Sequence, residues 1–164
     1  MTIKDVSSLL ILGDCIEEMS RLPNESINLI LTDPPYGTTK SNWDAVVPFE
    51  PMWREVKRVL KPDGVAVFTA CQPFSSALVM SNIEMFAYEW VWIKSKITGV
   101  LNAKKMPVRK HEQVLVFSNS KATKTYNPQG LIKKGTLTSQ GGNSSNYGER
   151  SSEAYIQEFT NWPR

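Results

Sequence analysis

Cysteine, histidine and long apolar runs are all scarce in this chain of 164 residues. Its cysteines, Cys15 and Cys71, have no metal-ligand spacing, and such free cysteines are typical of a reducing compartment. No apolar run approaches the ~20 residues of a membrane-spanning helix, and the amino terminus has no signal-peptide pattern. The absences argue against a disulfide scaffold. They also predict that the protein has no metal site and resides in the cytoplasm.

Acidic residues are missing from one long segment, although the whole chain is only mildly basic. The formal net charge of +3 is too small to indicate a nucleic-acid partner by itself. Between Lys94 and Lys110, however, every charged residue is basic: Lys94, Lys96, Lys104, Lys105, Arg109 and Lys110. A solvated loop is the ordinary interpretation of such a run, and contact with DNA phosphates is the functional one.

The most informative stretch runs from Thr32 to Gly37, directly after the apolar run Ile27 to Leu31. The apolar run predicts a buried strand, and open α/β sheets place their chemistry at the carboxyl ends of such strands. Pro34 and Pro35 cannot donate to a ladder, so the strand must end there in a stiff corner. Gly37 is free to adopt a positive φ.

The corner offers hydrogen-bond acceptors beside an aromatic ring. The acceptors are the Asp33 carboxylate and the carbonyls of Asp33 and Pro34, and the ring is that of Tyr36. They suit an amino group on a flat ring, because two acceptors that hold its N–H bonds draw the nitrogen towards a tetrahedral, nucleophilic geometry. A base inside a duplex cannot reach the corner and would have to be flipped out. In most proteins consecutive prolines mark only a turn, but the preceding strand favours function here.

Asp33-Pro34-Pro35-Tyr36 resembles the catalytic motif of the DNA amino-methyltransferases that use S-adenosylmethionine. The resemblance is to the β class, and to its phage and prophage adenine-specific members, and it extends to further short matches. These are Gly13-Asp14-Cys15, Trp43-Asp44, Pro48-Phe49, Gln72-Pro73-Phe74, Asn102-Ala103-Lys104-Lys105 and His111-Glu112. It implies that Asp33, Pro34, Pro35 and Tyr36 are catalytic, and that Asp14, Cys15 and Asp33 bind the cofactor. The substrate would be double-stranded DNA, as in restriction-modification systems.

In that family arrangement the catalytic half comes first, then target recognition, then a Gly-rich cofactor half. We expect this chain to hold only the first two, because it has no G-x-G-x-x-G or similar cradle after a strand. Residues 1–118 would be the catalytic part. Residues 119–164, rich in Ser, Thr, Asn, Gly and Lys, would be a loop-rich target-recognition region, and their composition fits disorder equally well.

The rest of the pattern predicts an α/β fold with mixed strand directions, which the resemblance makes a partial Rossmann-like methyltransferase sheet. Strands are predicted at Leu9–Leu12, Val65–Thr69, Tyr88–Ile93 and Gln113–Phe117, the last two antiparallel at a sheet edge. Helices are predicted after the N-cap Asp14, from Pro51 until Lys61–Gly64, and from Ser75 to Ser81. The loop Thr38–Val47 is either a lid or a surface connection with Trp43 packed down. We expect the sole histidine, His111, to be structural.

Three functions remain open on the sequence: an adenine N6-methyltransferase, a non-catalytic DNA-binding remnant, or one subunit of a split enzyme whose partner supplies the cofactor half. Cytosine N4 methylation is the alternative chemistry, although the resemblance favours adenine because Asp33 stands where cytosine enzymes more often carry serine. In the family fold, strands from the cofactor half would separate the strand at Leu9–Leu12 from the one ending at Asp33. Without them, we expect the catalytic strand to become a sheet edge that invites pairing with another chain.

Overall fold

The computed structural model describes residues 9–120, 132–133 and 159–160. The chain divides into two compact units, Met1–Thr125 and Tyr126–Arg164. In the second unit, strands β5 (Ile132–Lys133) and β6 (Phe159–Thr160) pair antiparallel. Most of the predicted recognition region 119–164 therefore lies outside the described residues. No helix in the described part is long and apolar enough to cross a membrane.

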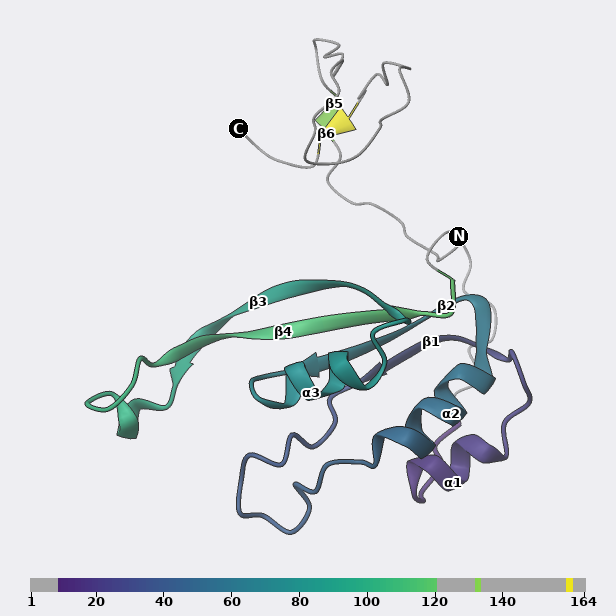
Figure 1. The fold of residues 1–164 in the computed structure, drawn as a ribbon, viewed down its shortest axis with the longest axis horizontal. Helices are drawn as coiled ribbons and strands as arrows, with labels where there is room; N and C mark the ends of the chain where they lie inside the picture. The colour runs from purple at the N-terminus through teal and green to yellow at the C-terminus, as the bar shows by residue number, and fades with distance from the viewer. Residues whose placement is uncertain (1–8, 121–131, 134–158, 161–164) are drawn as a thin grey trace. The chain divides into compact units, whose positions relative to one another are not determined.

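The first unit contains a sheet with the strand order β1-β2-β4-β3 (Figure 1). Its strands are β1 (Ile27–Thr32), β2 (Leu60–Ala70), β3 (Phe86–Thr98) and β4 (Arg109–Ser118). β1 is parallel to β2, whereas β4 is antiparallel to both of its neighbours. The predicted α/β class, the mixed strand directions and the antiparallel pair at a sheet edge are confirmed.

The helices α1 (Cys15–Ser20), α2 (Phe49–Val59) and α3 (Phe74–Ser81) all lie on one side of this sheet (Figure 1). Asp14 is the N-cap of α1, as predicted, and its Oδ1 accepts the N–H groups of Ile16 at 2.9 Å and Glu17 at 3.2 Å. This cap satisfies donors that a helix start otherwise leaves without partners.

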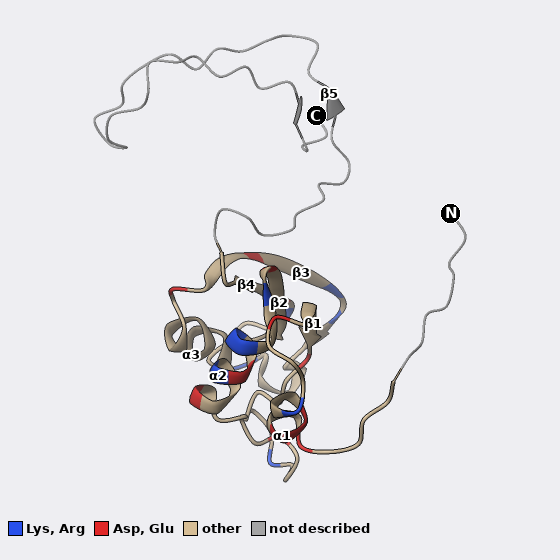
Figure 2. Ribbon diagram, turned by 90° about the vertical axis from the view of Figure 1, so that its right-hand side faces the viewer, with Lys and Arg blue, Asp and Glu red and all other residues tan. Residues whose placement is uncertain are grey.

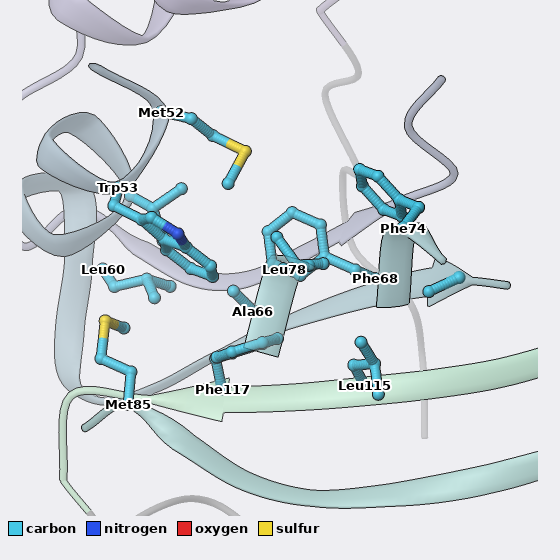
Figure 3. Close-up of a cluster of buried hydrophobic side chains, with 12 residues drawn as sticks. Met52, Trp53, Leu60, Ala66, Phe68, Phe74, Leu78, Met85, Leu115 and Phe117 are labelled. Carbon is cyan, nitrogen blue, oxygen red and sulfur yellow. The ribbon is translucent and has the colours of Figure 1, made fainter. Parts of the chain in front are cut away.

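The hydrophobic core fills the space between the sheet and these helices (Figure 3). Alternate residues of the central strands face it, among them Phe68 on β2, and Leu115 and Phe117 on β4. The ring centroid of Phe117 lies 4.8 Å from that of Trp53 on α2 and 5.7 Å from that of Phe68. Burying each of these large side chains contributes about 1.5–3 kcal/mol.

The opposite face of the sheet carries apolar side chains but no helix of the described residues (Figure 1). Because strand side chains alternate, Leu29 and Leu31 of β1 lie on this face beside Val65 and Val67 of β2. Leu29 is 53% exposed and Leu31 is 69% exposed. The prediction of a buried strand at Ile27–Leu31 is therefore wrong, since among the described strands β1 has one neighbour, and the described helices cover one face only. The expectation that this strand would form a sheet edge is confirmed.

The prediction of a strand at Leu9–Leu12 is also wrong. These residues form no strand, and the side chains of Leu10 and Leu12 are almost completely exposed. A strand needs a neighbour that accepts and donates its backbone hydrogen bonds. Among the described strands, β1 pairs with β2 alone, and no strand flanks it on the side where Leu9–Leu12 could join. An apolar run alone does not reveal whether such a neighbour exists.

A long hairpin made by β3 and β4 projects beyond the rest of the sheet (Figure 1). It corrects the prediction that Lys94–Lys110 is one loop. Lys94 and Lys96 belong to β3, and Arg109 and Lys110 belong to β4, because pairing continues from Ile93 with His111 to Thr98 with Arg109. Only residues 99–108, with the short 3₁₀ helix Val100–Asn102, form the turn.

The same leucine-to-alanine substitution should lower the free energy of unfolding by different amounts on the two faces of the sheet. Leu115→Ala should lower the free energy of unfolding by about 2–5 kcal/mol, because it leaves a cavity in the core. Leu31→Ala should change it by less than about 0.5 kcal/mol, because the side chain is mostly exposed. Urea unfolding of both variants at low protein concentration measures the difference. An equal cost at both positions would show that the open face is covered in solution.

Candidate active site

Asp33 and Thr69 lie next to each other at one edge of the sheet. The last pair in the parallel register of β1 and β2 joins Thr32 to Phe68, and Asp33 and Thr69 are the residues that follow. The carboxyl ends of parallel strands meet at the same sheet edge. The register thus brings a carboxylate and a hydroxyl together, although 36 residues separate them in the chain.

Three side chains form one hydrogen-bonded cluster at this edge. The hydroxyl of Tyr36 lies 2.7 Å from Oδ1 of Asp33 and 2.8 Å from Oγ1 of Thr69, as a donor to either. The Thr69 hydroxyl donates to the same Oδ1 of Asp33. Within the described residues, every hydrogen bond to the Asp33 carboxylate goes to Oδ1, which leaves Oδ2 free to accept from a ligand.

The cluster fixes the ionisation of its members. The hydrogen bond from Thr69 lowers the pKa of Asp33 most, followed by that from Tyr36, and Lys94 acts in the same direction. Burial raises the pKa of Tyr36 well above its usual value, and the neighbouring Asp33 charge adds to this shift. At neutral pH the site therefore holds an anionic carboxylate beside a neutral phenol.

The Tyr36 ring is held in place by a second aromatic residue. It stacks on Phe74 at the start of α3, with ring centroids 5.2 Å apart and an interplanar angle of 29°. Phe49 of α2 lies 6.0 Å from Phe74 and extends the contact. Phe74 belongs to Gln72-Pro73-Phe74, one of the short matches in the sequence, and the structure shows it supporting the predicted catalytic tyrosine.

The loop that follows the corner is anchored by a buried carboxylate. Asp44 accepts the backbone N–H of Gly37 at 2.8 Å and that of Thr39 at 2.6 Å. Burial would raise the pKa of Asp44, but these hydrogen bonds and one from the Thr39 hydroxyl lower it. Gly37 has the predicted positive φ, at +66°, and a Cβ there would meet Val46 at 2.8 Å. Trp43 is not packed down, because its side chain is 74% exposed.

The predicted cofactor residues Asp14 and Cys15 make no hydrogen bond to this cluster among the described residues. Asp14 caps α1 through Oδ1, and Cys15 is exposed. No hydrogen bond joins either residue to Asp33 within the described part of the chain. No described strand is followed by a Gly-rich turn. The described residues therefore form no Gly-rich cradle for a nucleoside cofactor.

The predicted DNA-binding residues differ in their surroundings. Lys94 forms an ion pair with Glu112 of β4 and lies 5.5 Å from the centroid of the Trp92 ring. Arg109 donates to the Gln72 carbonyl at 3.3 Å. The other members of the set have no ion-pair partner among the described residues: Lys96, Lys104, Lys105 and Lys110. In Figure 2 blue basic segments lie along β3.

A cavity of about 160 Å³ lies where β2 ends and β4 begins. Its lining includes Cys71, Gln72, Arg109, His111 and Glu112. His111 is exposed on β4. In the described part of the chain no cluster of three or more His, Cys, Asp or Glu residues could hold a metal ion.

Two residues near the cluster were not predicted from the sequence: Thr69, which bonds to Asp33, and Glu112, which pairs with Lys94. Thr69 lies next to the last residue of β2, an apolar strand that the structure places parallel to β1, so a polar residue near its carboxyl end was the available signal. Glu112 belongs to the matched His111-Glu112 pair, but its partner Lys94 lies 18 residues away and only the hairpin register brings them together.

A model of the DNA methylase family (N6_N4_Mtase) matches residues 27–162. The Type II methyltransferase M.HpaI of Haemophilus parainfluenzae is 29% identical over 128 residues, covering 72% of this chain and 41% of that protein. The Type II methyltransferase M1.MboII of Moraxella bovis is 29% identical over 119 residues, covering 66% of this chain and 45% of that protein. The chain thus spans less than half the length of these relatives.

Solved structures show the same fold at low identity. The cytosine-N4-specific PvuII DNA methyltransferase has a TM-score of 0.51 and 20% identity, covering 67% of this chain and 48% of that one. The DNA modification methylase TTHA0409 of Thermus thermophilus, solved with S-adenosyl-L-methionine, has a TM-score of 0.50 and 19% identity, covering 71% and 56%. The sheet is thus part of a Rossmann-like methyltransferase fold. Because the family model covers most of its residues, the chain belongs to the DNA methylase family of N6 and N4 amino-methyltransferases.

Proposed function

We propose that the chain is the catalytic part of a DNA methyltransferase that moves a methyl group from S-adenosylmethionine to the exocyclic N6 amine of a flipped adenine. The observation that carries this proposal is the cluster of Asp33, Thr69 and Tyr36 at the sheet edge. It presents an ionised carboxylate with one unoccupied oxygen beside a stacked aromatic ring. Family membership supports the reaction class.

In this mechanism the protein orients a neutral amine. Oδ2 of Asp33 accepts one N–H of the base and a carbonyl of the Asp33-Pro34 corner accepts the other, which frees the nitrogen lone pair. Tyr36 holds the base by stacking, a contact worth about 1–3 kcal/mol. S-adenosylmethionine, when bound, supplies an electrophilic methyl group. As the nitrogen bonds to that methyl carbon, the bond between the carbon and the cofactor's sulfur would break and leave a neutral thioether. The nitrogen would then lose one of its protons to solvent.

The cofactor would need residues beyond the described site. Asp14 and Cys15 are the candidates for its adenine end, and Asp33 borders its methyl group. The methionine end would be held by a Gly-rich half that the described residues lack, supplied by further residues of the same protein or by a partner chain. The runner-up chemistry is N4 methylation of cytosine, which the same acceptors could serve.

Asp33→Ala should abolish methyl transfer in the enzyme completed with a cofactor half, while DNA binding stays largely intact. Loss of a transition-state acceptor typically lowers turnover by about 100- to 1,000-fold. Transfer of a radiolabelled methyl group to unmethylated duplex DNA, with binding measured in parallel, tests this. Glu84→Ala, a change at an exposed acidic residue away from the cluster, is the control. Near wild-type turnover in Asp33→Ala would contradict the assignment.

The basic residues of the hairpin are proposed to contact DNA phosphates, with Lys104 and Lys105 in its exposed turn as the strongest candidates. The projecting part of the hairpin leaves the sheet near this cluster, because Glu112, which pairs with Lys94, directly precedes Gln113, the partner of Ala70 at the end of β2. Residues 119–164 are proposed to recognise the target sequence. The enzyme would work in the cytoplasm of a bacterium, with a phage or prophage origin.

Replacing Lys104 and Lys105 by alanine should weaken binding to all DNA sequences alike. The slope of log affinity against log salt should fall by about one for each lost phosphate contact. The matched control, Lys57→Ala with Lys61→Ala, removes the same charge near the opposite end of β2. Fluorescence anisotropy across a salt titration measures both. An unchanged slope in the hairpin variant would show that these lysines are solvated and contact no phosphate.

The uncovered edge is proposed to bind another chain. β1 pairs on one side only, and Leu29 and Leu31 leave apolar surface beside that free edge. Unpaired edge strands with apolar side chains invite pairing with a further strand. The occupant we infer is a partner chain that carries the Gly-rich cofactor half, with self-association in its absence. A decayed, non-catalytic DNA-binding remnant is the alternative.

Alone, the chain should therefore bind S-adenosylmethionine weakly, transfer no methyl group and elute as more than a monomer. Leu29→Lys should restore a monomer, because a charge on an edge strand opposes pairing. The control is Met80→Lys, a similar change at an exposed position on α3. Size-exclusion chromatography, calorimetric titration and a methyl-transfer assay provide the measurements. A monomer that binds the cofactor at micromolar concentration and methylates DNA unaided would refute the need for a partner.

A further inference from the structure

Thr69 lies in the catalytic cluster but belongs to none of the motifs through which the sequence resembles the family. It is the next-to-last residue of β2, where its neighbours Phe68 and Ala70 face the core and its own hydroxyl bonds to Asp33. We propose that Thr69 is a positioning residue that holds Oδ1 of Asp33 and so reserves Oδ2 for the amine of the target base.

The geometry gives the hydroxyl a specific task. A carboxylate on a short side chain can rotate about its last bond, and either oxygen can then face a ligand. The Thr69 hydroxyl and the Tyr36 hydroxyl both bond to Oδ1, and they also lie within hydrogen-bond distance of each other at 2.8 Å. Two donors from different elements on one oxygen fix the plane of the carboxylate.

Thr69 also suits the task because its own position is rigid. It is half-buried and is paired with Val114 in the antiparallel register of β2 and β4. As a β-branched residue in a strand it has few rotamers, so its hydroxyl direction is determined by the sheet. Tyr36, by contrast, lies in the corner after β1 and is held through its ring by Phe74.

Two charged groups near the cluster affect the pKa values of different members of it. Lys94 on β3 lowers the pKa of Asp33, whereas Glu112 on β4, which pairs with Lys94, raises the pKa of Tyr36. Neither group donates to Oδ1. The surroundings therefore leave the hydroxyl of Thr69 as the largest influence on Asp33.

The inference rests on the proposed function, and its test separates the two. Thr69→Val keeps the shape and strand preference of the side chain but removes the hydroxyl, and Thr69→Ser keeps the hydroxyl. NMR titration of the Asp33 side-chain carboxyl carbon in this chain, assigned with Asp33→Asn, reports the hydrogen bond without any assay of activity. Methyl transfer by the completed enzyme reports the consequence for turnover.

Thr69→Val should move the Asp33 titration to higher pH and lower kcat by about 10- to 100-fold, with little change in KM for DNA. In Thr69→Ser, both the Asp33 titration and kcat should stay close to their wild-type values. Thermal unfolding monitored by circular dichroism verifies that both variants fold.

An Asp33 titration in Thr69→Val that matches wild type, or a kcat within about twofold of wild type where Asp33→Ala is inactive, would overturn the proposal. If the wild-type completed enzyme transfers no methyl group, the proposed function fails, and the titration still decides whether Thr69 holds Asp33.

Discussion

The parallel register of β1 with β2 is the constraint on which the candidate site depends. It places Thr32, the last residue of β1, opposite Phe68, so Asp33 and Thr69, which follow them, both contribute to the cluster. A one-residue slip would move Thr69 to the core face and Phe68 to the open face. The core opposes such a slip, because Phe68 packs against Trp53 and Phe117. The hydrophobic core therefore maintains the polar geometry at the sheet edge.

Local signals in the sequence were sufficient for the elements whose structure is locally determined. The proline pair stops β1 at Thr32, Asp14 caps α1, and Gly37 takes a positive φ, because each depends on residues a few positions apart. The predictions that were wrong depended on which strands and helices lie next to a segment in space. Whether Leu9–Leu12 forms a strand and whether β1 is buried depend on how many strands and helices surround them. Apolar runs do not encode that number.

Among the described residues, helices cover only one face of the sheet, and β1 and β3 are its edge strands. α2 and α3 bury Phe68, Leu115 and Phe117 completely or almost so, while Leu31 on the other face stays largely exposed. Apolar atoms on both sides of a sheet are typical of strands that are covered twice. The composition of β1 is thus typical of an interior strand, although β1 lies at the edge of the sheet. This mismatch is the physical basis of the proposal that a further strand pairs with β1.

The buried Asp44 carboxylate divides the segment after the corner into two parts with different freedom. Its bonds to the N–H groups of Gly37 and Thr39 close a small ring that begins directly after the Asp33–Tyr36 corner, and the exposed segment from Lys40 to Trp43 extends from that ring. Lengthening a loop costs little, about 0.6 kcal/mol for each doubling. Insertions and substitutions at this tip can therefore accumulate during evolution without moving Asp33, which makes it a natural place for an amino-methyltransferase to diversify.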